Sequence, residues 1–99
     1  MFSDLEDGKY LCRTEGREFV AEIKVSKSGF SFKTSEVPAI SYYCIEDFIK
    51  RGKYRVLKRV RNGETQYGSK DTLRVWSKTD FTIYPLKAGI PLYCKKIDV

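Results

Sequence analysis

The segment "REFVAEIKVS", residues 17–26, contains the clearest secondary-structure signal in this chain of 99 residues. Apolar and polar residues alternate along it, and Val20 alone breaks the alternation. The apolar positions are Phe19, Ala21, Ile23 and Val25, and the polar ones are Glu18, Glu22 and Lys24. Because successive side chains of a strand point to opposite sides of a sheet, this pattern predicts a strand with one buried face and one solvated face.

Short alternating segments occur along most of the remaining chain. They are residues 8–15, 30–35, 53–70, 72–77, 81–86 and 90–97. Glu15-Gly16 predicts a turn, and Gly29 stands where a three-residue hairpin needs a left-handed residue. Asn62-Gly63 is a strong hairpin signal within residues 53–70. Pro85 and Pro91 confine their strands to sheet edges or strand ends.

Residues 41–52, "SYYCIEDFIKRG", form the best helix candidate, which predicts a short helix over residues 41–51. Ser41 is suited to cap it, and Gly52 to follow its end. A buried stripe is expected at Cys44, Ile45, Phe48 and Ile49, from their i, i+4 spacing. A strand over residues 40–43 followed by a single helical turn is the alternative.

These elements predict a mainly β, or β-rich α+β, single domain that covers residues 1–99. We expect a small antiparallel barrel or a two-layer sheet of about seven short strands, with the one helix near residues 41–51. An OB-like, an SH3-like and an unfamiliar topology all agree with this pattern. With 41% hydrophobic and 14% aromatic residues, the chain has material for a core, which argues against disorder.

Cysteine usage and hydropathy indicate a reduced intracellular setting. The chain has three widely spaced cysteines, Cys12, Cys44 and Cys94. An odd number at such spacing is not typical of a disulfide framework or a zinc site. We therefore expect reduced, partly buried thiols. The acidic start "MFSDLEDGKY" is no signal peptide, and no segment has the roughly 20 apolar residues that cross a bilayer. A cytoplasmic protein without a membrane partner is expected.

The positive charge is concentrated in the second half of the chain. The net charge is +6, but residues 1–49 hold six basic and nine acidic side chains, whereas residues 50–99 hold thirteen and four. The densest segment is "KRGKYRVLKRVR", residues 50–61, with seven Lys or Arg and no acid. Such asymmetry indicates an acidic partner for one surface.

Placed on a strand, the basic segment would present a row of cations to a polyanion. Same-face neighbours lie about 6.6 Å apart, which suits contacts with successive phosphates of nucleic acid. Tyr67 and Trp76 lie among further cations and could stack on bases of a single-stranded DNA or RNA. The predicted nucleic-acid-binding residues are Lys50, Arg51, Lys53, Arg55, Lys58, Arg59, Arg61, Tyr67, Lys70, Arg74 and Trp76.

Structural interpretations of the same residues stay open. A charged strand face is often only the solvated side of a sheet, and cations also protect edge strands. Trp76 and the tyrosines are also natural core residues of a small domain. Tyr42 and Tyr43 would either form an exposed patch or pack over a barrel end.

The sequence favours a protein that is not an enzyme and needs no cofactor. It contains no His, the commonest general base and metal ligand, and its glycines are scattered at turns instead of forming a phosphate loop. The thiols therefore lack their usual activating base. One alternative is a His-free ribonuclease in which Glu64 or Asp71 acts near the basic hairpin, with a cation to stabilise the phosphorane.

A second hypothesis is a protein-binding modulator or inhibitor that docks its basic face on an acidic partner protein. The chain has only three Ala but abundant Lys, Ser, Tyr, Phe and Ile, which suggests an AT-rich coding genome. A bacteriophage or mobile-element accessory protein acting on a host protein would fit. The pattern fixes neither the target nor the oligomeric state.

Overall fold

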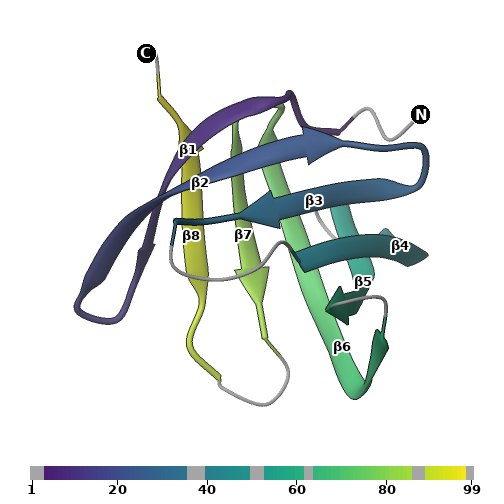
Figure 1. Ribbon diagram of the computed structural model, residues 1–99. Coiled ribbons are helices and arrows are strands. Elements are labelled where there is room, and N and C mark those ends of the chain that lie inside the picture. The colour runs from purple at the N-terminus through teal and green to yellow at the C-terminus, as the bar shows by residue number, and fades with distance from the viewer. Residues whose placement is uncertain (1–3, 36–39, 50–52, 62–63, 86–88, 98–99) are drawn as a thin grey trace.

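Eight antiparallel strands make up the described part of the chain in the computed structural model (Figure 1). The structure describes the backbone of residues 4–35, 40–49, 53–61, 64–85 and 89–97, and the side chains of residues 4–35, 40–42, 60, 71–85 and 89–97. The strands are β1 (Gly8–Thr14), β2 (Arg17–Val25), β3 (Gly29–Lys33), β4 (Ile40–Ile49), β5 (Lys53–Arg61), β6 (Glu64–Ser77), β7 (Asp80–Tyr84) and β8 (Leu92–Lys96).

The strands form a closed barrel in which each one pairs with the next along the chain, and β8 pairs with β1. The closing register places Cys12 opposite Cys94, and β1 and β8 lie side by side in Figure 1. The predicted antiparallel barrel is therefore confirmed, and the two-layer alternative is not adopted. The strand order is a plain meander, which differs from the Greek-key order of an OB fold. Closure gives every strand two neighbours.

The alternation predicted for residues 17–26 is observed on β2. Ala21 and Ile23 are buried, and Phe19 and Val25 pack against the core from partly buried positions. Val20, the exception in the pattern, lies on the outer side and is exposed. Burial of the inner set removes apolar surface from water, which is the main force holding the strand in the barrel.

Aromatic residues fill much of the barrel interior. Phe81 is fully buried, with its ring centroid 5.3 Å from that of Tyr10 and 5.9 Å from that of Phe30. Both contacts are tilted, a geometry that ring quadrupoles favour. Phe30 and Phe32 share the buried face of β3 as the sequence predicts. These bulky residues give a 99-residue chain a continuous core.

The helix predicted over residues 41–51 is wrong, because residues 40–49 form β4. This strand pairs with β5 from Ile40↔Arg61 to Ile49↔Lys53, and the register shifts between Cys44 and Glu46. The extra residue at such a bulge interrupts strict alternation. The sequence can therefore have two apolar residues in a row, Cys44 and Ile45, which also fits a helical pattern. The expected start of a strand at Ile40 is confirmed, but it continues past Tyr43. Residues 50–52, including the predicted helix end, lie outside the described residues.

Three smaller expectations can be compared with the strands. Gly16 lies in the predicted turn between β1 and β2 and has a positive φ of 68°. Gly29 begins β3 and lacks the predicted left-handed conformation. β5 and β6 form the predicted hairpin, with Arg61 opposite Glu64, although Asn62 and Gly63 lie outside the described residues. β6 then continues to Ser77 as one strand, where two were expected.

Pro85 directly follows β7, and Pro91 directly precedes β8, so both stand at strand ends as predicted. Within the part of the chain that the structure describes, no helix is long and apolar enough to cross a membrane.

Candidate nucleic-acid interface

The outer surface of β6 carries an exposed tryptophan beside an arginine. Leu73 is buried and Val75 packs against the core, so the alternating residues Arg74 and Trp76 project outward. The Trp76 side chain is 52% exposed. The alternative in which Trp76 is a core residue is therefore wrong, and the sole Trp of the chain lies on the surface.

Two contacts hold the Trp76 ring in place. The guanidinium carbon of Arg74 lies 3.6 Å from the ring centroid, a close cation–π contact. The indole Nε1 donates a 2.9 Å hydrogen bond to Oγ1 of Thr82 on β7. Thr82 projects outward between the core residues Phe81 and Ile83, yet it is 0% exposed. An exposed ring that is fixed at two points loses little further freedom when a ligand stacks on it.

The register continues this surface across the next strands. Arg74 is opposite Thr82, Thr82 is opposite Tyr93 of β8, and Tyr93 is opposite Arg13 of β1. Directly opposite residues project to the same side of a sheet, and Tyr93 is 53% exposed. We call the outer residues Arg74, Trp76, Thr82 and Tyr93 the aromatic face. β6, β7 and β8 lie side by side in Figure 1.

Cations surround the aromatic face. Lys78, at the turn between β6 and β7, and Lys95 on β8 are exposed. Arg13 is exposed as well, and its Nε forms a 3.0 Å ion pair with Oε1 of Glu18 on β2. Because both partners of that pair face water, the contact is weak and Arg13 can still turn to an anionic ligand.

Only two of the eleven predicted binding residues have described side chains. They are Arg74 and Trp76, and the structure brings them into contact. Lys50 and Arg51 lie outside the described residues. For the others only the backbone is described: Lys53, Arg55, Lys58, Arg59 and Arg61 belong to β5, and Tyr67 and Lys70 to β6. The cationic row predicted on β5 therefore remains a prediction.

The backbone of the basic strand adjoins the aromatic face. β5 pairs with β6, with Tyr54 opposite Arg74 and Lys58 opposite Lys70. Adjacent strands lie about 4.8 Å apart, so the strand with the densest positive charge in the sequence is the immediate neighbour of the strand that carries Trp76. The barrel meander thus gathers β5, β6, β7 and β8 into one continuous wall.

Tyr93 is the functional candidate that the sequence prediction omitted. Its neighbours Leu92 and Cys94 pack toward the core, and alternation alone places Tyr93 outside. The signal was present in "IPLYCKKI", but its position beside Trp76 depends on the pairing of β7 with β8. The other uncertain aromatic, Tyr42, is buried, and the side chain of Tyr43 lies outside the described residues.

The described side chains offer little acid–base or metal chemistry. Among them, no group of three or more Cys, Asp or Glu is placed to hold a metal ion. Asp71, a base candidate of the ribonuclease hypothesis, lies inside the barrel at 2% exposure, and the side chain of Glu64 is outside the described part. Cys12 and Cys94 are buried free thiols, and burial raises the pKa of the Cys94 thiol beside Cys12.

Comparisons with protein-family models, with curated proteins and with solved structures find no match to this chain.

Proposed function

We propose that this protein is a small non-catalytic module that binds single-stranded nucleic acid on the wall formed by β5, β6, β7 and β8. Bases stack on the aromatic face, and phosphates contact the cations of the surrounding surface together with the opposite pair Lys58 of β5 and Lys70 of β6. The observation that carries this proposal is the half-exposed ring of Trp76 on β6, the strand that pairs with the basic strand β5. Arg74 and Thr82 hold this ring in place.

Stacking supplies the preference for single strands. An exposed aromatic ring gains about 1–3 kcal/mol from one stacked base, and bases inside a duplex are not accessible in this way. β7 separates the strands of Trp76 and Tyr93, so the two strand axes are about 10 Å apart. Two bases of one extended strand can therefore occupy the two rings.

Fluorescence measurements test the proposal directly, because Trp76 is the only Trp of the chain. Labelled single-stranded oligonucleotides should raise the anisotropy of the label and quench the Trp76 emission over the same concentration range. For single strands, the affinity should fall by about 0.7 log units per log unit of salt for each phosphate contact. Duplex DNA of the same length should bind more weakly.

Matched variants separate stacking from general charge. Trp76→Leu and Tyr93→Leu should each weaken binding about tenfold, the loss of one stacked base. Val20→Ala alters a similarly exposed apolar residue on β2 and should leave binding unchanged. Equal effects of all three variants, or an isotherm insensitive to salt, would remove the proposal.

The same residues would also suit an acidic protein, because Trp, Tyr and Arg are enriched at protein interfaces. Affinity capture from a nuclease-treated host lysate distinguishes the two partners. A bound acidic protein that survives nuclease, together with oligonucleotides that fail to quench Trp76, would replace nucleic acid by a protein partner. Such a result would fit the modulator hypothesis and the phage or mobile-element origin suggested by composition.

A further inference from the structure

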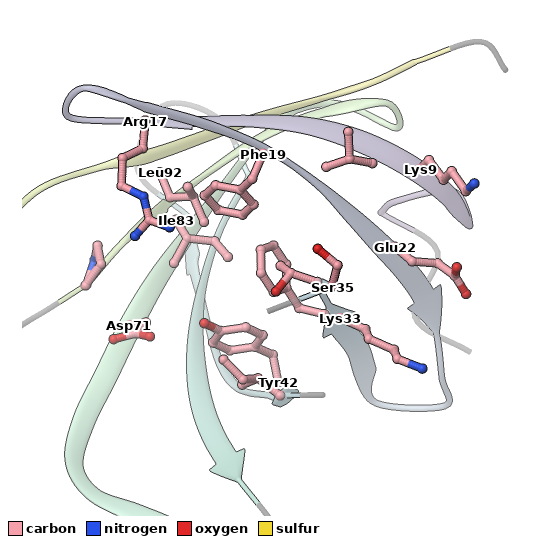
Figure 2. A pocket seen from close by; sticks show the side chains of 15 residues that line it. Lys9, Arg17, Phe19, Glu22, Lys33, Ser35, Tyr42, Asp71, Ile83 and Leu92 are labelled. Carbon is pink, nitrogen blue, oxygen red and sulfur yellow. The ribbon is translucent and has the colours of Figure 1, made fainter. Parts of the chain in front are cut away.

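The barrel contains a cavity that the nucleic-acid proposal does not use. Its volume is about 750 Å³. Pockets of a few hundred to about 1,000 Å³ hold small organic ligands, and the interior of an eight-stranded barrel is wide enough for one such molecule. Figure 2 shows the cavity surrounded by side chains of strands from both halves of the chain.

The register explains where the cavity opens. The described ladder between β2 and β3 runs from Glu22↔Lys33 to Val25↔Phe30, so residues 17–21 of β2 extend beyond it. Arg17 and Phe19 from this stretch line the cavity, together with Lys33 at the end of β3 and Leu92 at the start of β8. The cavity therefore opens at the end of the barrel where β2 and β8 begin and β3 ends.

Most of the cavity wall is apolar. Among the residues whose side chains the structure describes, the apolar ones on the inner side are Phe19, Phe32, Ile40, Tyr42, Ile83 and Leu92. The rings of Phe19 and Phe32 meet edge to face with centroids 6.2 Å apart. Such a wall favours an aromatic or other apolar body, because binding removes apolar surface from water on both sides.

One buried carboxylate interrupts the apolar lining. Asp71 of β6 is 2% exposed and belongs to the cavity wall. A carboxylate has about four acceptor positions, so it can accept a hydrogen bond from a ligand besides the interactions it makes within the barrel. In Figure 2, the Tyr42 hydroxyl lies on the Asp71 side of the cavity, and the Arg17 guanidinium points in from the start of β2.

We infer that the barrel interior is a binding site for a small, mainly apolar molecule with a hydrogen-bond donor, a protonated amine or a hydroxyl, directed at Asp71. The apolar lining holds the body of the ligand, and the buried carboxylate selects its polar end. This site is separate from the outer aromatic face and does not rest on the nucleic-acid proposal.

Three probes with the same ring system test the selection: naphthylethylamine, naphthylethanol and naphthylethyl methyl ether. Calorimetric titration should give the tightest binding for the amine, weaker binding for the alcohol and the weakest for the ether, which has no hydrogen-bond donor. The methyl resonances of Ile83 and Leu92 should shift on binding. Those of Leu5 should not, because Leu5 lies at the other end of the barrel, where Glu6 N donates to Lys78 O.

Two variants assign the roles of wall and carboxylate. Asp71→Asn keeps the size of the side chain and should weaken amine binding about tenfold or more, as expected for loss of a hydrogen bond to a charged group. Leu92→Trp should fill the entrance and abolish binding of all probes. Ile90→Trp is the matched control, because Ile90 is exposed and does not belong to the wall.

Failure of all probes to bind, or shifts outside the cavity wall, would overturn the site. Equal affinity for the three probes, unchanged in Asp71→Asn, would overturn the role of the carboxylate. If Asp71→Asn does not fold, two measurements still test the proposal. The order of the three probes on the natural chain tests the role of the carboxylate, and the comparison of Leu92→Trp with Ile90→Trp tests the cavity. Trp76→Leu should leave probe binding unchanged, which separates this site from the aromatic face.

Discussion

The indole N–H of Trp76 donates its hydrogen bond to a threonine that has no exposed surface of its own, Thr82 on the neighbouring strand. The pair joins β6 to β7 through side chains on the outside of the barrel. It also determines the orientation of the ring that we propose as the stacking platform, so its removal should affect both stability and binding.

Thr82→Val keeps the shape of the side chain but removes the acceptor. We expect the free energy of unfolding to fall by about 1 kcal/mol, the usual contribution of one hydrogen bond. Oligonucleotide affinity should also fall, because the ring is no longer fixed. Urea unfolding and anisotropy titration measure the two effects. Thr82→Ser retains the hydroxyl and should lose less stability and less oligonucleotide affinity than Thr82→Val. Equal losses for the two variants would contradict the role of the hydrogen bond.

Charge reversal on β5 and β6 tests the phosphate contacts. Lys58 of β5 and Lys70 of β6 are opposite each other, and Lys70 is four residues before Arg74 on the same strand. Changed together to Glu, they should abolish oligonucleotide binding at physiological salt while leaving the circular dichroism spectrum unchanged, because phosphate contacts supply most of the affinity. Lys24, exposed on β2, provides the control: Lys24→Glu changes the net charge away from the proposed wall and should have little effect. Comparable loss in the control would indicate a general charge effect instead of a defined surface.

Cys12 and Cys94 should form a disulfide under oxidising conditions. Directly opposite residues of antiparallel strands have Cα atoms about 4.5–5.5 Å apart, within the range of about 4.4–6.8 Å that disulfides require. With oxidised glutathione, the two thiols lose two electrons and two protons, and two molecules of reduced glutathione form. The reaction should be slow in the folded protein, because burial raises the pKa of Cys94 and thiolate is the reactive form.

Closing a loop of roughly 80 residues should stabilise the barrel by about 4.5 kcal/mol in the chain-entropy model. Thermal unfolding of oxidised and reduced protein in a Cys44→Ser background measures the gain. Cys12→Ser removes the partner and should show no gain. Failure of the two thiols to pair under oxidation would argue against the observed register, and a disulfide that forms without raising the melting temperature would argue against the entropic gain.

Tyr10 should make the barrel sensitive to alkaline pH. Its hydroxyl donates a 2.7 Å hydrogen bond to the backbone carbonyl of Glu6, and burial raises its pKa to about 12 from the usual 10.0. Between these pH values, the unfolded chain releases a proton that the folded chain keeps. The stabilisation is therefore complete below pH 10 and is lost as the pH rises toward 12, by up to about 2 kcal/mol.

Urea unfolding at several pH values above 9 checks this dependence against Tyr10→Phe. The variant should be less stable at neutral pH by about 1 kcal/mol, because the hydrogen bond is missing, and should lose less stability at high pH. Parallel pH profiles for the two proteins would contradict a raised pKa at Tyr10.

Gly8→Ala should destabilise the start of β1. Gly8 has a φ of 149°, and a methyl group there would lie 2.6 Å from Cε of Lys96. The Lys96 side chain would have to move, which disturbs its 3.2 Å ion pair with Glu6. A loss of about 1–2 kcal/mol in urea unfolding is expected from the backbone conformation. Adding Lys96→Ala should restore little, because it relieves the contact but not the φ angle.

Local patterns predicted the strands whose two faces differ in polarity. β2 and β3 follow the alternation closely, and the hairpin between Arg61 and Glu64 follows from turn chemistry. The segment of residues 41–49 was misassigned because its bulge at Cys44 and Glu46 produces apolar neighbours that also fit a helix. Its long pairing with β5 supplies the backbone hydrogen bonds that decide between the two structures, and pairing between strands is not a local property.

The candidate site was predictable only in part, for the same reason. Alternation around Leu73 and Val75 could have placed Arg74 and Trp76 outside, and alternation around Cys94 could have placed Tyr93 outside. Their common surface arises from the registers Arg74↔Thr82 and Thr82↔Tyr93, which depend on how distant strands pair. The cavity around Asp71 likewise exists only when the barrel closes.

The pairing of β8 with β1 has a consequence for synthesis in the cell. The last seam joins Tyr10↔Lys96 and Arg13↔Tyr93, so it cannot form until residue 96 has left the ribosome exit tunnel. Until then the nascent chain exposes two unpaired strand borders, which are prone to intermolecular association. Slower translation should therefore not help this protein to fold step by step during synthesis. Chaperones that shield exposed strands during that interval should raise the yield of folded protein.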